Sequence, residues 1–165
     1  MNYIQCPDNY IEKSEYTVSV SIFLAGGISN CYNWQDNIVE LFRNKKYGDH
    51  IALINPRREN FDKTIPGLEK EQIEWEHKHL KLADIILFWF PSETVCPITL
   101  YELGTWSSKE KHIFLGIDKN YERRLDVEIQ TKLVRPEIKI VYDLESLCEQ
   151  IDNNIKDVAM EKFWR

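Results

Sequence analysis

The sequence of 165 residues is 43% hydrophobic and 12% aromatic, which suits one globular domain with a sizeable core. Its 21 basic and 27 acidic residues give a net charge of −6, which disfavours nucleic acid polymers and anionic membranes as partners. We therefore expect a single domain over residues 1–165 that binds small molecules.

The four cysteines are far apart and form no CxxC pair. The N-terminus carries no signal-like apolar segment, and no apolar run approaches the roughly 20 residues of a membrane-spanning helix. Reduced thiols and a cytoplasmic location are the expectation.

Apolar runs alternate with segments of helical spacing along the chain. After a loosely docked lead-in over residues 1–15, strands are expected at 19–24, 51–55, 85–90, 112–117 and 138–143. Helices are expected at 31–45, at 69–84, from Pro97 onward and at 143–160, the last capped by Asp143. This order predicts an α/β fold, a three-layer sandwich with a five-stranded, mainly parallel sheet of the flavodoxin-like or Rossmann-like kind.

In such folds a ligand binds at the carboxyl ends of the strands, which here would gather residues 25–31, 55–62, 90–102 and 117–123. The sequence has neither GxGxxG nor GxxxxGK[ST], so hydride transfer and P-loop phosphoryl transfer are disfavoured. His77 and His79 fall on opposite sides of a helix, which favours a solvated face over a metal site. No cofactor or metal is therefore expected.

Gly26 and Gly27 stand between the first predicted strand and its helix. One interpretation is a tight strand-to-helix turn. The other is a backbone cradle for a sugar or phosphate, with hydrogen bonds added by Ser29 and Asn30.

The most informative carboxylate is Glu102, in the segment LYELG near the start of a helix. A helix N-terminus favours the ionised form, which suits a nucleophile, although a surface salt bridge is the alternative. Glu74 or Glu76, on the preceding helix, can face Glu102 across a cleft, whereas Asp84 at a strand start is expected to be structural.

Three segments, IFLAGGISNCYNWQ, INPRRENFD and QIEWEHKHLKLADIILFWFPSETVCPITLYELG, together resemble the nucleoside 2-deoxyribosyltransferase-like superfamily. The resemblance covers about residues 22–122. It implies a flavodoxin-like parallel sheet, and often a homo-oligomer in which a neighbouring subunit completes the site.

The resemblance also implies roles for single residues. Glu102 matches the nucleophile that attacks the anomeric carbon of a deoxynucleoside, and Glu76 matches a base or sugar contact and candidate proton donor. The other candidate substrate contacts are Gly26, Gly27, Ser29, Asn30, Asn55, Arg57, Glu93 and Thr94. Arg57 would contact a phosphate if the substrate is a nucleotide, and would form part of the wall if it is a nucleoside.

The leading hypothesis is thus transfer of 2-deoxyribose between nucleobases in nucleoside salvage, with a nucleoside or nucleotide and a free nucleobase as partners. One alternative is an N-glycoside hydrolase acting on nucleosides or their 5′-monophosphates with the same carboxylates. A non-catalytic nucleotide-binding module is the other.

Overall fold

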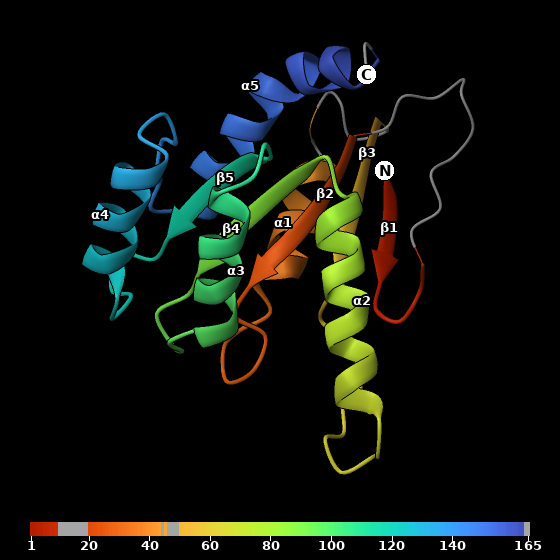
Figure 1. Ribbon diagram of the computed structural model, residues 1–165. Coiled ribbons are helices and arrows are strands. Elements are labelled where there is room, and N and C mark those ends of the chain that lie inside the picture. Colours follow the sequence, from red (N-terminus) through yellow and green to blue (C-terminus); the bar gives the residue numbers. More distant parts are fainter. Residues whose placement is uncertain (10–19, 44, 46–49, 164–165) are drawn as a thin grey trace.

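The computed structural model describes residues 1–9, 20–43, 45 and 50–163 (Figure 1). Its centre is a parallel sheet of five strands, in the order β1-β3-β2-β4-β5. The strands are β1 (Asn2–Gln5), β2 (Val20–Gly26), β3 (Ile51–Asn55), β4 (Ile85–Phe90) and β5 (His112–Ile117).

Helices cover both faces of the sheet, so the predicted three-layer α/β architecture is confirmed (Figure 1). One face carries α2 (Leu68–Leu82), α3 (Pro97–Ser107) and α4 (Arg124–Val134). The opposite face carries α1 (Trp34–Arg43) and α5 (Leu144–Phe163). Among the described residues, no helix combines the length and hydrophobicity that crossing a bilayer requires.

The environment of strand β4 explains why its sequence shows no alternation of polar and apolar residues. All six of its residues are buried. Ile86, Phe88 and Phe90 pack in the core beneath α2 and α3. The alternate residues Ile85, Leu87 and Trp89 pack beneath α1 and α5. A strand with helices over both faces is apolar throughout.

The sheet has five strands as predicted, but one of the five predicted segments is not a strand. Residues 138–143 form no strand, only an isolated bridge between Val141 and Gly116 beside β5. Ile138 and Ile140 instead pack against the core beneath α2 and α3, and the Lys139 carbonyl accepts a hydrogen bond from the Gln150 side chain. The segment joins the edge of the sheet at Val141, whose N–H donates to the Leu115 carbonyl at 3.1 Å and whose carbonyl accepts from Ile117 at 2.9 Å.

The fifth strand comes from the N-terminus, where a loosely docked lead-in was expected. Residues 2–5 form β1, which pairs with β3 from Asn2 opposite Ala52 to Gln5 opposite Asn55. Within β1 only Ile4 is buried, so the sequence alone carries a weak strand signal. Residues 10–15 of the predicted lead-in lie outside the described residues.

Two features near the C-terminal half complete the comparison. Helix α4 was not predicted; only Val127 and Thr131 along it are buried, and most of its apolar residues remain exposed. The Asp143 cap is confirmed, since Asp143 Oδ1 accepts a hydrogen bond of 2.7 Å from the backbone N–H of Ser146.

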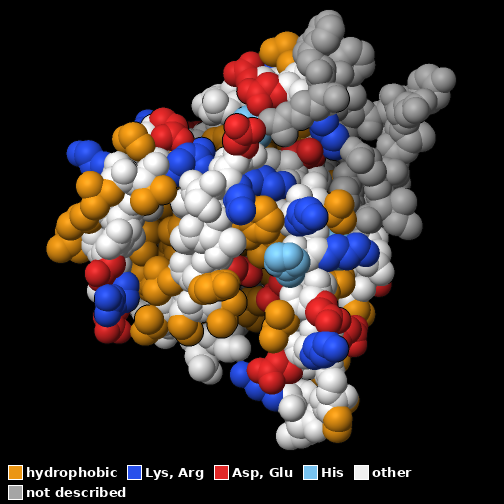
Figure 2. Space-filling view, in the orientation of Figure 1, with side chains coloured by type: hydrophobic (Ala, Val, Ile, Leu, Met, Phe, Trp, Pro, Cys, Tyr) orange, Lys and Arg blue, Asp and Glu red, His pale blue; other side chains and the backbone are white. Residues whose placement is uncertain are grey.

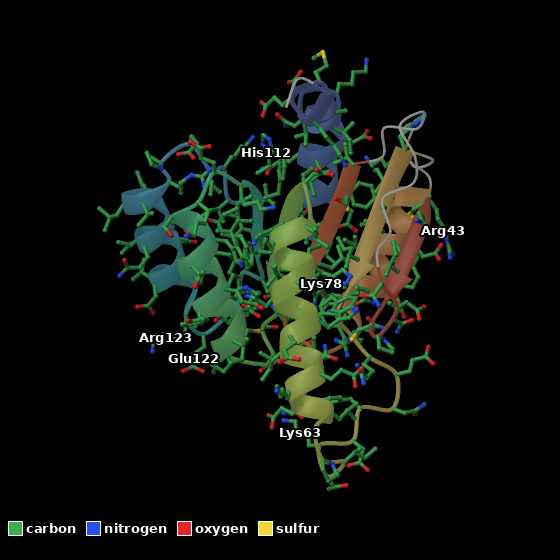
Figure 3. The ribbon with its side chains drawn as sticks, turned by 45° about the vertical axis from the view of Figure 1, so that its right-hand side comes forward. Arg43, Lys63, Lys78, His112, Glu122 and Arg123 are labelled. Carbon is green, nitrogen blue, oxygen red and sulfur yellow. The ribbon has the colours of Figure 1, made fainter. Side chains whose placement is uncertain are left out.

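The sheet places the predicted site segments at one edge. His112, the first residue of β5, lies at the upper end of the molecule in Figure 3, and Glu122 and Arg123, which follow β5, lie at the lower end. The lower end is therefore the carboxyl edge. The strand order reverses between β2 and β4, where a ligand crevice is expected in folds of this class.

Candidate active site

Gly26 and Gly27 are explained by close packing. A Cβ atom on Gly26 would lie 2.4 Å from the Trp89 carbonyl oxygen and 2.5 Å from Trp34 Cζ2. One on Gly27 would lie 2.8 Å from Pro91 Cγ and 2.9 Å from Thr94 Cγ2. Close packing therefore accounts for both glycines without a ligand. The predicted tight strand-to-helix turn is wrong, because Gly26 is the last residue of β2 and α1 begins only at Trp34.

Arg57 ties the loop after β2 to the end of β3. Its guanidinium donates hydrogen bonds to the carbonyl oxygens of Gly27 (3.4 Å) and Tyr32 (3.1 Å) and to Gln35 Oε1 (3.0 Å). Asn55 is 1% exposed, and its Oδ1 accepts the backbone N–H of Arg57 at 2.9 Å. Both side chains thus belong to the wall of this edge.

The remaining predicted contacts lie in two neighbouring loops at the same edge. Ser29 and Asn30 are exposed in the loop after β2, and Asn30 has a left-handed backbone with φ of 59°. Glu93 is exposed and Thr94 half-buried in the loop after β4. The Glu93 charge raises the pKa of Cys31, after the larger effect of burial, so the two loops lie side by side.

Glu102 and Glu76 face each other from neighbouring helices. Glu102 lies in the second turn of α3 and Glu76 in the middle of α2, on the same face of the sheet. Burial, followed by the like charge of Glu76, raises the pKa of Glu102 to about 8. Figure 2 shows acidic side chains between these two helices. Glu74, the other candidate, is exposed and pairs with Lys70.

The expectation that the helix N-terminus keeps Glu102 ionised is wrong. Glu102 is one turn too far along α3 for a strong dipole effect, whereas removal of water and the neighbouring carboxylate both act against its charge. Burial also raises the pKa of Glu76, although a hydrogen bond of 2.8 Å from Gln72 Nε2 works in the opposite direction. The carboxyl pair therefore carries a proton at neutral pH.

Two cavities open near the carboxyl edge of the sheet. One of 730 Å³ has Trp89, Tyr32 and Asp118 in its wall, and one of 520 Å³ has Arg57 and Arg58 in its wall. Arg57 is the single predicted site residue that lines either of them. Glu76 and Glu102 line neither cavity, and their proximity is shown by the effect of the Glu76 charge on the pKa of Glu102.

The sequence missed the residues that surround Glu76. Gln72 lies four residues before Glu76 on the same helix, a spacing that could have indicated contact between them. Cys6 donates from its thiol to Gln72 Oε1 at 3.1 Å and accepts from Arg58 at 3.5 Å. No signal in the sequence indicates that the residue after the edge strand reaches this site.

Two expectations outside the site can also be checked. Asp84 is structural, because its Oδ2 accepts hydrogen bonds from the Ser21 backbone at 2.8 Å and from Lys162 at 3.0 Å. His77 is exposed as expected, but the solvated face predicted for His79 is wrong, since its ring is buried and stacked 3.9 Å from Trp75. Within the described ranges, no group of three His, Cys, Asp or Glu residues is placed to hold a metal ion.

Comparison with known proteins agrees with this architecture. The family model described as "Nucleoside 2-deoxyribosyltransferase like" matches residues 19–121, more than half of the chain. The crystal structure of a conserved protein from Enterococcus faecalis V583 is similar, with a TM-score of 0.63 and 16% identity over 82% of this chain and 99% of that one. Identity this low shows the shared fold alone. A search of curated proteins found no match.

Proposed function

Because the chain belongs to the nucleoside 2-deoxyribosyltransferase-like family, we propose that it transfers a 2-deoxyribosyl group between nucleobases through a covalent bond to Glu102. The observation that carries this proposal is the half-buried carboxyl pair of Glu102 and Glu76, which holds a proton at neutral pH. One carboxylate and one proton are what a retaining displacement at an anomeric carbon requires.

The first half of the reaction breaks the glycosidic bond. The Glu102 carboxylate attacks C1′ of the deoxynucleoside, and the electron pair of the C1′–N bond passes to the base nitrogen. The shared proton, held on Glu76 at this stage, moves to the departing base. The product is a deoxyribosyl ester of Glu102 and a neutral free base.

The second half reverses these steps with another acceptor. A nitrogen of the incoming base attacks C1′, the ester bond to Glu102 breaks, and the proton of that base returns to Glu76. Atoms and charge balance with these two carboxyl groups alone, so the proposal includes no cofactor. Water in place of the second base would give net hydrolysis.

The other predicted contacts take supporting roles in this proposal. Gly26 and Gly27 lie at the closely packed end of β2 beside the sugar, and the exposed Ser29 and Asn30 offer it hydrogen bonds. Asn55 and Arg57 form the wall, and Glu93 and Thr94 border the sugar from the loop before α3. The substrate is a nucleoside or nucleotide together with a free nucleobase.

We also infer a homo-oligomer, and we assign the enzyme to nucleoside salvage in the cytoplasm. Large apolar side chains remain exposed on the two helices that carry the carboxyl pair. Ile73 of α2 is 59% exposed, and Ile98 and Tyr101 of α3 are 64% and 75% exposed. A second subunit placed on these side chains would cover them and shield the carboxyl pair from solvent.

The test is a chromatographic assay of the purified protein with deoxyinosine or thymidine, with and without free adenine. A new deoxyadenosine peak that is lost in Glu102→Ala supports the transferase. Free base without a new nucleoside indicates the hydrolase. No product from nucleosides or their 5′-monophosphates, with thermal stabilisation by those ligands, indicates a binding module.

A further inference from the structure

Gln72 forms a complete set of hydrogen bonds next to the carboxyl pair. Its Nε2 donates at 2.8 Å to Glu76 Oε1 and at 2.8 Å to the carbonyl oxygen of Pro56. Its Oε1 accepts at 3.1 Å from the Cys6 thiol. Because both N–H bonds and the carbonyl oxygen have partners, the orientation of the amide is fixed, and an N–H always points at Glu76.

The carboxyl groups of Glu76 and Glu102 differ in the hydrogen bonds that they receive. Glu76 receives a hydrogen bond from a side chain that is only 9% exposed. Within the part of the chain that the structure describes, no donor reaches the Glu102 carboxyl group. A donated hydrogen bond stabilises a carboxylate more than a carboxylic acid, so the negative charge of the pair is favoured on Glu76.

From this geometry we propose that Gln72 is a positioning residue that fixes the Glu76 carboxyl group and decides which member of the pair holds the shared proton. In the ligand-free protein the proton rests on Glu102. The inference rests on the proposed function for its catalytic meaning, because the proton must pass to Glu76 before Glu102 attacks. The hydrogen bond from Gln72 sets how much free energy that transfer requires.

The other groups around Glu76 do not supply this preference. Glu102 faces it from α3, and the neutral Cys6 and the Pro56 carbonyl lie beyond Gln72. Burial raises the pKa of Cys6, so this thiol stays protonated and keeps donating to Gln72.

The nearest cation in the network is Arg58. It donates to Cys6 at 3.5 Å and pairs with the exposed Glu71 at 2.8 Å, so it is directed away from the pair.

The experiment follows the carboxyl carbons of Glu76 and Glu102 by NMR, in protein labelled with ¹³C at the glutamate carboxyl groups, over pH 4 to 10. Single-carboxyl backgrounds separate the two titrations. In Glu102→Gln, adding Gln72→Met should raise the pKa of Glu76 by on the order of one unit, because a hydrogen bond to the charged form is lost. In the matched Glu76→Gln background, the same change should leave the pKa of Glu102 unaltered.

An unchanged pKa of Glu76, or an equal change of Glu102 in the control background, overturns the proposal. Melting temperatures of all variants show whether each remains folded. In the assay of transfer, Gln72→Met should also move the acid limb of kcat/KM to higher pH. The NMR titration needs no turnover, so it tests the role of Gln72 even in a protein without transferase activity. Absence of that activity would refute the proposed function alone.

Discussion

The hydroxyl group of Tyr121 donates a hydrogen bond of 2.6 Å to the carbonyl oxygen of Val95. This bond joins the segment after β5 to the loop that leads into α3, the helix of Glu102. The Tyr121 ring is 3% exposed and lies 5.2 Å from the ring of Phe90. The carboxyl edge is therefore held together by contacts between segments that are distant in the sequence.

Replacing Tyr121 with Phe should lower the free energy of unfolding by about 1 kcal/mol, because the hydrogen bond is lost while the ring packing is kept. Urea denaturation measures the change. Tyr142→Phe is the matched control, since its hydroxyl bonds Glu128 at the surface and its loss should be smaller. Equal losses in the two variants would contradict a special role for the bond to Val95.

Gly27→Ala should destabilise the protein by about 1–3 kcal/mol, because the new methyl group would lie within 3.0 Å of Pro91, Thr94 and Cys96. Gly104→Ala serves as the control. It lies inside α3 with nothing within 4 Å of the added atom, and it should stabilise the helix by about 0.5–1 kcal/mol. Thermal denaturation compares the two, and a harmless Gly27→Ala would return weight to a ligand cradle.

Glu102→Gln should stabilise the protein at pH 7 to 8 and change it little near pH 4. The pKa of Glu102 is about 8 in the folded chain, against a usual value of 4.5, so the folded state binds the proton more tightly than the unfolded state. Stability from this group is fully present below about pH 4.5 and is lost as the pH rises toward 8. Unfolding curves of both proteins across this range measure the effect, and a constant difference would argue against the raised pKa.

The kcat/KM of transfer should fall above about pH 8, where the pair loses its last proton and with it the group that protonates the departing base. It should also fall at low pH, where both carboxyl groups are protonated and no nucleophile remains. Glu76→Gln should remove the like charge, lower the pKa of Glu102, and leave a much reduced rate. An alkaline limb that persists unchanged in Glu76→Gln would assign the titration to another group.

The sequence predicted those helices and strands whose own residues show an apolar pattern typical of a buried element. The run IILFWF predicts a strand that is covered on both faces. The helical spacing of Trp34, Ile38 and Phe42 predicts the buried side of α1. Strand β1 has one buried residue and exists because β3 offers it an edge, so no local pattern could identify it. The reverse holds for residues 138–143, whose apolar pattern resembles a strand although only Val141 pairs with β5, while Ile138 and Ile140 pack against a core.

In the candidate site, too, some features could be predicted from the sequence and others depend on contacts made only in the folded protein. The sequence predicted that Glu74 or Glu76 can face Glu102, and in the structure the charge of Glu76 acts on Glu102. The state of their shared proton depends on burial and on Gln72, which in turn is fixed by Cys6 and the Pro56 carbonyl. Interactions that join the N-terminus, the end of β3 and α2 exist only after folding.

The position of β1 also constrains the order in which the chain assembles during its synthesis. Its partner β3 lies about 50 residues later, with Tyr3 opposite Leu53. Strand β1 leaves the ribosome before β3 and must therefore wait for this partner until β3 has emerged. Cys6 follows β1 directly, so its bond to Gln72 forms later still, after α2 has been made. A nascent chain stopped before residue 72 would thus expose Cys6 to thiol reagents, and a completed one would protect it.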